Sequence, residues 1–243
     1  MTPRLFVFPE RIRDGEAVLD SEQSHYITNV LRGRPGDTLF VFDGSGREWE
    51  GTLRFRGKSL LVQLVEPRTP SVESPLSITL AVAIPRGDKM EWIVQKGTEL
   101  GVARIVPVLS ARSEVRLPAE RQTRRLKRWE AVAREAAEQS GRVRVPEIGP
   151  PMTVEALVLS DESAASRLWL DPRGEEAWRD LGAGRGAAFL LAVGPEGGWT
   201  DSELALARGN GFRIVRAGPR TLRVETAAVV FLALLQSRFG DLL

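Results

Sequence analysis

Hydrophobic and polar residues alternate in short runs along the first 70 residues. Pairs of turn residues such as Asp43-Gly44 and Arg56-Gly57 separate these runs, a pattern typical of strands. One helix is expected over Gln23–Arg32, where apolar residues recur at helical offsets. The expected strands are Leu5–Phe8, Ala17–Leu19, Thr38–Phe42, Glu48–Phe55 and Ser59–Val65. Short strands at this spacing predict a small β-barrel.

The segment Arg68–Pro75 is rich in Pro and Ser and interrupts both periodicities. Beyond it, apolar strands alternate with amphipathic helices, which predicts an α/β domain with a mainly parallel sheet. We therefore expect two domains, residues 1–70 and 71–243. The expected strands of the second are Ile78–Ile84, Arg104–Leu109, Arg167–Leu170, Ala187–Val193 and Arg213–Arg216. Its expected helices are Lys89–Leu100, Glu120–Gln139, Glu175–Leu181, Asp201–Asn210 and Val224–Phe239.

A glycine-rich turn follows the buried strand Ala187–Val193. Gly194, Gly197 and Gly198 let backbone N–H groups approach a ligand at the carboxyl end of a strand, where α/β sheets bind small molecules. A plain strand-to-helix turn explains the glycines equally well. Neither a dinucleotide fingerprint nor a P-loop is present, so the turn lacks the sequence support that a nucleotide site would have.

A second Gly-Pro turn follows the strand Arg213–Arg216. Five arginines and no acid lie between Arg208 and Arg223, so an anionic partner is expected near this turn, with a solvated basic edge as the alternative. If the two strands are neighbours, both turns lie at one sheet edge and form a single pocket.

The long expected helix is also basic. Residues 112–144 hold ten basic residues and five acids. This excess of positive charge is typical of a nucleic-acid-binding surface, and the alternative is a solvated helix face.

Composition excludes several chemistries. The chain has no cysteine and one histidine, His25, so disulfides, thiolate chemistry and a His-based metal site or triad are not expected, and no metal is assigned. We assign His25 no role. No apolar run reaches the ~18 residues of a membrane span, and the N-terminus does not look like a secretory signal, so we expect a cytoplasmic location.

At Gly194-Pro-Glu-Gly-Gly and Gly218-Pro-Arg-Thr-Leu-Arg-Val-Glu-Thr-Ala the sequence resembles the SPOUT superfamily, specifically the bacterial 16S ribosomal RNA uridine-N3 methyltransferases. Further similar stretches cover the chain in order: 25–32, 36–37, 86–91, 95–96, 99–102, 135–139, 141–142 and 238–241.

This resemblance implies the architecture and the partners. It implies an N-terminal PUA-like, RNA-binding barrel and a C-terminal domain with a deep trefoil knot near residues 167–243. It also implies a homodimer through the C-terminal domain and S-adenosylmethionine as methyl donor. The implied substrate is 16S ribosomal RNA or the small ribosomal subunit, not DNA.

The resemblance also implies the site residues. The donor is expected in three loops, at the end of the strand at Leu170, at Gly194–Gly198 and at Ala217–Leu222. The cofactor-binding residues are then Leu170, Gly194, Glu196, Gly197, Gly198, Ala217, Gly218, Leu222 and Thr226. Glu225 is the candidate base, with Arg223 or Arg220 stabilising charge on the uracil oxygens. Residues assigned to RNA are Arg4, Arg32, Arg86, Lys89, Arg112, Gln139 and Arg142.

Three alternatives stay open at this point. One is a non-catalytic RNA- or ribosome-binding protein, and another is a methyltransferase of the same superfamily that acts on a different RNA. The third is a nucleotide-dependent enzyme that uses the Gly194–Gly198 turn for phosphate, against which the missing P-loop lysine counts.

Overall fold

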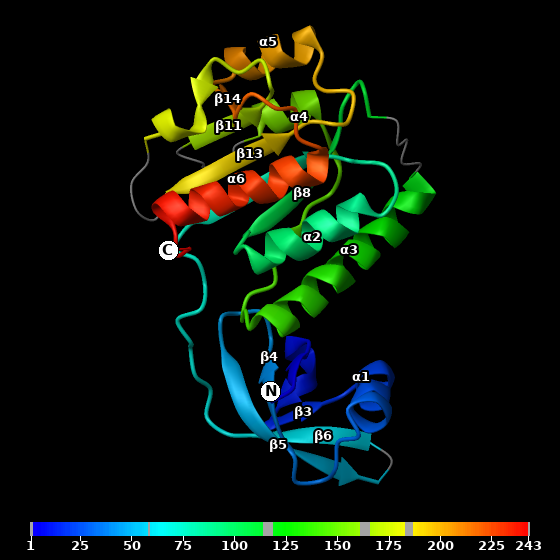
Figure 1. Cartoon of the computed structure of the whole chain (residues 1–243). Helices are drawn as coiled ribbons and strands as arrows, with labels where there is room; N and C mark the ends of the chain where they lie inside the picture. Colours follow the sequence, from blue (N-terminus) through cyan, green and yellow to red (C-terminus); the bar gives the residue numbers. More distant parts are fainter. Residues whose placement is uncertain (1, 58, 114–118, 161–165, 183–186, 243) are drawn as a thin grey trace. The chain divides into compact units, whose positions relative to one another are not determined.

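The computed structural model describes residues 2–57, 59–113, 119–160, 166–182 and 187–242; for 119–121 the description is limited to the backbone. It divides into two compact units (Figure 1). The first is Met1–Glu73 with Ala137–Val145, and the second is Ser74–Ala136 with Pro146–Leu243. The functional division at residue 70 stays a prediction, and in the structure a later segment of the chain joins the first unit.

The first unit is built on a mixed six-stranded sheet in the order β1-β4-β5-β6-β3-β2. Strand β1 pairs with β4 in parallel and the other pairs are antiparallel. Alternate apolar side chains such as Leu39, Val41 and Val62 form its core. The strands are Arg4–Phe6 (β1), Ile12–Arg13 (β2), Glu16–Val18 (β3), Thr38–Phe42 (β4), Glu48–Arg56 (β5) and Ser59–Leu64 (β6). A short 3-10 helix, Pro9–Arg11 (η1), precedes β2.

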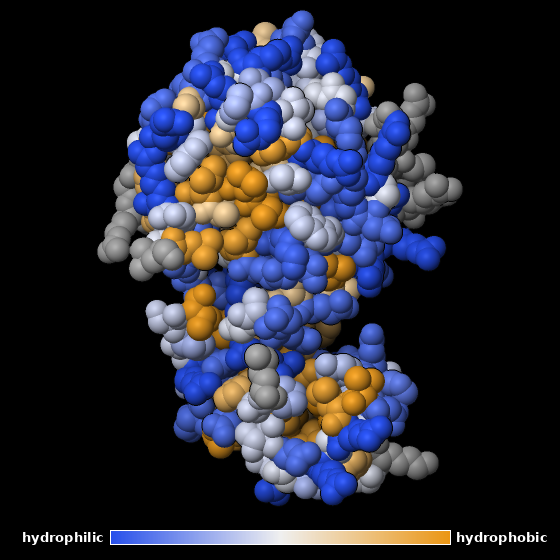
Figure 2. Space-filling model, in the orientation of Figure 1, coloured by the Kyte–Doolittle hydropathy of each residue, from blue (hydrophilic) through white to orange (hydrophobic). Residues whose placement is uncertain are grey.

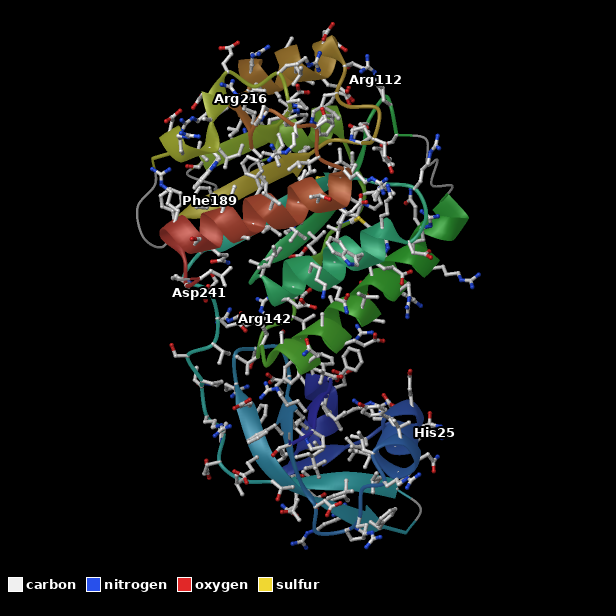
Figure 3. The ribbon with its side chains drawn as sticks, viewed as in Figure 1. His25, Arg112, Arg142, Phe189, Arg216 and Asp241 are labelled. Atoms are coloured by element: carbon white, nitrogen blue, oxygen red, sulfur yellow. The ribbon has the colours of Figure 1, made fainter. Side chains whose placement is uncertain are left out.

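The expected helix over Gln23–Arg32 has two parts. Helix α1 (Ser21–His25) starts at a capping box between Asp20 and Gln23, and a π-helix (η2, Tyr26–Val30) continues it. Of the apolar residues Tyr26, Ile27, Val30 and Leu31, only Ile27 is buried. His25 lies on α1 (Figure 3), and its Nδ1 is 2.7 Å from the side-chain amide nitrogen of Asn29.

The second unit contains an entirely parallel sheet, as the α/β pattern predicts. Its order is β10-β8-β7-β13-β11-β14-β12, and β9 also pairs with β8. The strands are Ser77–Ala83 (β7), Arg104–Leu109 (β8), Glu147–Ile148 (β9), Met152–Thr153 (β10), Ser166–Leu170 (β11), Glu176–Ala177 (β12), Ala188–Val193 (β13) and Arg213–Arg216 (β14).

Helices cover this sheet. Helices α4 and α5 share a hydrophobic core with alternate strand residues that include Trp169 and Leu190. Helices α2 and α6 pack against each other (Figure 1). The helices are Lys89–Glu99 (α2), Ala119–Ser140 (α3), Val154–Leu159 (α4), Asp201–Gly209 (α5) and Val224–Phe239 (α6). No helix among the described residues is long and apolar enough to span a membrane.

The predicted helix Glu175–Leu181 is wrong. Glu176 and Ala177 form β12, which pairs with Val215 and Arg216 of β14, and a short 3-10 helix follows over Trp178–Asp180 (η3). Arg213 also pairs with the Glu176 carboxylate. Pairing with a strand far along the chain overrides the local helical spacing.

The capping box predicted at Thr200 and Glu203 is present at the start of α5. Thr200→Ala should lower the free energy of unfolding by about 1 kcal/mol, because the Glu203 N–H loses its side-chain acceptor. Thr200→Ser keeps the hydroxyl and is the control. Chemical denaturation measures both variants, and equal stability of Thr200→Ala and wild type would contradict the assignment.

Candidate functional site

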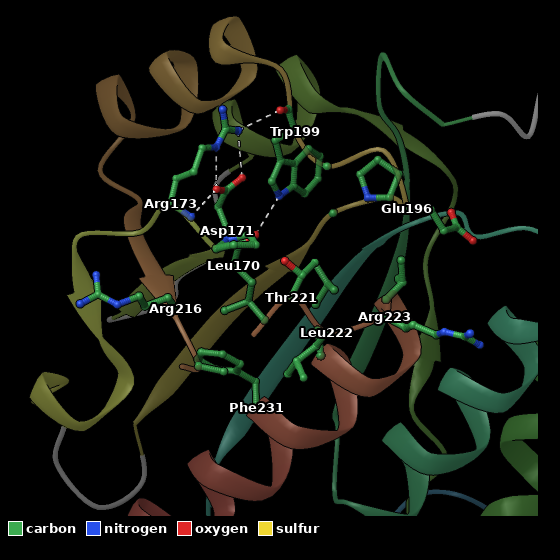
Figure 4. Close-up of a pocket in the computed structure, with 18 of the residues that line it drawn as sticks. Leu170, Asp171, Arg173, Glu196, Trp199, Arg216, Thr221, Leu222, Arg223 and Phe231 are labelled. Carbon is green, nitrogen blue, oxygen red and sulfur yellow. Dashed lines mark hydrogen bonds and ion pairs between the residues drawn. The ribbon is translucent and has the colours of Figure 1, made fainter. Parts of the chain in front are cut away.

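Three loops meet at the carboxyl edge of the parallel sheet. They follow β11, β13 and β14, and together with the start of α6 they line a pocket of about 530 Å³ (Figure 4). The two Gly-Pro turns do not follow neighbouring strands, because β11 lies between β13 and β14. The intervening strand adds a third loop, and all three line one pocket.

The wall of the pocket is largely apolar. Leu170 and Leu222 line it, and so do Val193 and Val215 at the ends of their strands. Phe231 of α6, which the sequence did not single out, completes this wall. Side chains of this kind suit the flat, apolar surface of a nucleoside.

Trp199 explains why position 194 is a glycine. A Cβ at Gly194 would lie 2.8 Å from the indole Nε1, which real Cβ contacts essentially never show. The indole is 1% exposed, packs 4.3 Å from Trp169 between ring centroids, and donates a hydrogen bond to the Leu170 carbonyl at 3.0 Å. Gly194 therefore makes room for an internal side chain. Gly198, with φ of +67°, forms the tight turn itself.

An ion pair holds the loop after β11. Arg173 Nε donates to Asp171 Oδ1 at 2.9 Å, and Arg173 Nη2 donates to Asp171 Oδ2 at 3.1 Å. The same guanidinium reaches the Trp199 carbonyl (Figure 4). It also reaches the Asp201 carboxylate. The hydrogen bond to Asp171 is the main reason that the pKa of Arg173 is raised above its ordinary value.

Lys89 lies between two carboxylates near the pocket. Its Nζ is 3.2 Å from Glu196 Oε1 and 3.6 Å from Glu225 Oε2. Burial acts to raise the pKa of Glu196, but hydrogen bonds from its own N–H, the Arg86 N–H and the Lys89 ammonium lower it below the usual value. Glu225 Oε2 is buried, and none of the described residues donates a hydrogen bond to it.

Most of the residues expected to hold a donor lie in this pocket. Those that line it are Leu170, Gly194, Glu196, Gly197, Gly198, Ala217, Gly218 and Leu222. Thr226, in the first turn of α6, is not among them, and neither is Glu225. The candidate charge-stabilising residues Arg220 and Arg223 both line the pocket.

Arg112 also lines the pocket, although the sequence assigned it to RNA. Its Nη1 donates to the carbonyls of Gly197 and Trp199 at 3.0 and 3.3 Å. Of the other residues assigned to RNA, Arg32, Arg86 and Gln139 are exposed, and Arg32 has a left-handed backbone with φ of +55°.

Internal contacts occupy the guanidinium groups of Arg4 and Arg142, which the sequence analysis assigned to RNA. Arg142 is 6% exposed and donates through Nε and Nη2 to Glu73 Oε2 at 3.0 and 2.7 Å. Arg4 pairs with the buried Glu48 and donates to the carbonyls of Gly141 and Arg142. Both residues hold the first unit together.

Sequence reasoning missed several residues of the pocket. Their contacts join positions far apart in the chain, such as Arg173 and Trp199, so periodicity carries no signal for them. Asp171 is the one residue that the sequence could have indicated, because it is an acid directly after a buried strand, where α/β sheets bind ligands. The missed residues are Asp171, Arg173, Trp199, Arg216 and Phe231.

A parallel α/β sheet with a pocket at its carboxyl edge defines the chain as a small-molecule-binding α/β protein. Residues 72–236 match the family of RNA methyltransferase domains. Residues 19–65 match the family of RNA methyltransferase PUA domains. The chain belongs to this RNA methyltransferase family, in which its relatives are ribosomal RNA small subunit methyltransferases E.

Two such relatives cover most of the chain. The protein of Synechocystis sp. is 37% identical, over 96% of this chain and 77% of its own. That of Bacillus subtilis is 33% identical, over 88% of this chain and 87% of its own. The crystal structure of the Neisseria gonorrhoeae protein bound to S-adenosyl methionine is 33% identical, matches with a TM-score of 0.89 and covers 100% of both chains.

Proposed function

We propose that this chain methylates N3 of a specific uridine in the 16S RNA of the small ribosomal subunit, with S-adenosylmethionine as donor. The observation that carries the proposal is the pocket that three loops form at the carboxyl edge of the sheet. The names of the relatives support the ribosomal RNA substrate, and the S-adenosyl methionine bound in the Neisseria structure supports the donor. We also propose a cytoplasmic location, which the proposed ribosomal RNA substrate supports.

The residues of the pocket fit this donor. Its volume of about 530 Å³ lies within the ~300–1,000 Å³ typical of small-molecule sites. Leu170 and Leu222 would cover the apolar surface of the nucleoside, while the loops at Gly194–Gly198 and Ala217–Gly218 would offer backbone groups to its polar atoms. When bound, the sulfonium supplies an electrophilic methyl group.

The chain's own residues must orient uracil and take the proton from N3. We propose Glu225 as the base, since its Oε2 is a buried acceptor to which no described residue donates a hydrogen bond. Arg220 and Arg223 would stabilise negative charge on the uracil oxygens from the rim of the pocket. Thr226, one residue beyond Glu225, would contact the donor from the start of α6.

The RNA surface that we propose comprises Arg32, Arg86, Lys89, Arg112 and Gln139. We leave out Arg4 and Arg142, because their ion-paired side chains are only 16% and 7% exposed, whereas the side chain of Lys89, which is also ion-paired, is 33% exposed. We also retain the trefoil knot near residues 167–243 as part of the proposal.

We propose a homodimer through the C-terminal domain. Figure 2 shows a hydrophobic patch over α6, and Val229, Val230, Ala233 and Leu234 of this helix are only half-buried. Such a surface suits a second copy of the chain.

Val230→Arg should convert the proposed dimer to a monomer, because a charge would have to be buried unpaired in the interface. Sedimentation velocity measures the mass. Ala205→Arg, at an exposed position of α5, is the matched control and should stay dimeric. A wild-type monomer, or a dimeric Val230→Arg, would contradict this interface.

Mass mapping of 16S RNA from cells that lack the protein tests the substrate. One uridine should lose a methyl group on N3 and regain it on complementation. If no small-subunit uridine changes, the substrate assignment fails, and methylation lost from another RNA would favour the alternative substrate. Calorimetric titration with S-adenosylmethionine separates the enzyme from a non-catalytic RNA-binding protein, which would give no binding heat.

A further inference from the structure

Two hydrogen bonds join the loop after β11 to the loop after β13, and they run in opposite directions. Arg173 Nη2 donates to the Trp199 carbonyl at 3.0 Å, and the Trp199 indole donates to the Leu170 carbonyl at 3.0 Å. Both loops line the pocket. Trp199 is therefore bonded both to Leu170 and to Arg173, and all three residues line the proposed donor site.

The anchor of this link is a buried acid. The side chain of Asp171 is 2% exposed, and its two oxygens accept from Arg173 Nε and Nη2 as well as from the Arg173 backbone N–H. The paired hydrogen bonds from Nε and Nη2 to the carboxylate fix the plane of the Arg173 guanidinium, and Nη2 also donates to the Trp199 carbonyl. The end of β14 also contacts the loop after β11, because Arg216 Nη1 donates to the carbonyls of Gly174 and Glu175.

We propose that Arg173 is a positioning residue for the methyl donor. It holds the loop after β13 against the loop after β11, so that the pocket has its binding shape before the donor enters. The inference rests on the proposed function, because it takes the pocket to be the donor site. A site whose loops are held in advance loses less conformational entropy on binding, which strengthens affinity without any contact to the ligand.

The alternative is that Arg173 only neutralises Asp171. Removing the cation that pairs with the buried Asp171 carboxylate leaves an unpaired charge and destabilises the fold, whatever the loops do. If Arg173 only neutralises Asp171, adding Asp171→Asn to an Arg173 variant should restore both stability and affinity. If Arg173 positions the loop after β13, the same substitution should restore stability alone. The neutral amide that this substitution introduces removes the unpaired charge but provides no bond to the Trp199 carbonyl.

The test compares Arg173→Met, the double variant Asp171→Asn/Arg173→Met and Arg173→Lys. Affinity for S-adenosylhomocysteine is measured by calorimetry, stability by melting temperature, and loop mobility by hydrogen exchange of residues 194–200 without ligand. Arg208→Met is the matched control, because Arg208 also forms an ion pair, with Glu175, but does not line the pocket.

We expect Arg173→Met to weaken S-adenosylhomocysteine binding about tenfold and to speed exchange at residues 194–200. The double variant should regain melting temperature but not affinity. Arg173→Lys should behave like Arg173→Met in binding, because an ammonium cannot reproduce the paired hydrogen bonds. Arg208→Met should bind as the wild type does.

Recovery of affinity in the double variant would overturn the inference, and so would wild-type affinity in Arg173→Met. Either result leaves the proposed function intact, because the wild type still binds. A wild-type protein that binds neither S-adenosylmethionine nor S-adenosylhomocysteine overturns the proposed function, and the inference with it.

Discussion

Glu225→Gln should lower turnover at saturating donor by about 10²- to 10⁴-fold, the range that a positioned general base contributes. The amide is nearly isosteric with the carboxylate but cannot take the N3 proton of uracil. Because Glu225 does not line the pocket wall, affinity for S-adenosylhomocysteine should stay within about twofold of the wild type. Single-turnover methyl transfer and calorimetry measure the two quantities.

A second variant, Lys89→Met, distinguishes a general-base role of Glu225 from a purely structural role in an ion pair. Lys89 pairs with Glu225 at 3.6 Å, so an ion-pair role for Glu225 predicts that the two variants lose the same activity. A base role predicts a much larger loss of turnover in Glu225→Gln. Glu91→Gln, which removes a carboxylate of α2 that pairs with Arg128 of α3, is the control. Unchanged turnover in Glu225→Gln with the donor still bound would end the assignment.

Gly194→Ala should weaken S-adenosylhomocysteine binding by about tenfold or more and cost roughly 1–3 kcal/mol of stability, the range for an overpacked core. The new Cβ would lie 2.8 Å from Trp199 Nε1 and 2.9 Å from Cε2. Trp199 cannot retreat freely, since Trp169 packs against it and its N–H is bonded to the Leu170 carbonyl. Either the indole or the loop must move.

Gly209→Ala is the matched control for this substitution, because a Cβ there meets nothing within 4 Å. It lies in the last turn of α5, away from the pocket lining, and should leave binding unchanged. Adding Trp199→Phe to Gly194→Ala removes the nitrogen-bearing ring and should restore part of the stability. Calorimetry and thermal melting that show Gly194→Ala to be indistinguishable from wild type would contradict the packing argument.

Much of the second unit follows from its sequence pattern. The apolar runs at Ile78–Ile84 and Ala187–Val193 correspond to buried parallel strands, and the Thr200–Glu203 capping box starts α5 where expected. These features are local, since strand period and cap chemistry depend on residues close together in the chain. The glycine turns likewise located the pocket.

Contacts between distant residues account for what the sequence could not predict. The order β13-β11-β14, with β11 inserted between the strands of the two Gly-Pro turns, depends on pairing between distant segments. The segment Glu175–Leu181 has a helical spacing, yet strand pairing with β14 overrides it. From the sequence alone, Arg142 is expected to be a surface cation. The structure shows that it pairs with Glu73, which is distant in the chain.

Identification of the reaction product tests the central claim most directly. Purified small ribosomal subunits that lack the modification are incubated with the protein and S-adenosylmethionine, and the 16S RNA is digested to nucleosides for mass spectrometry. The account predicts one N3-methyluridine per subunit and none with Glu225→Gln. Methylation at another atom, or subunits left unmodified by a protein that binds the donor, would contradict it.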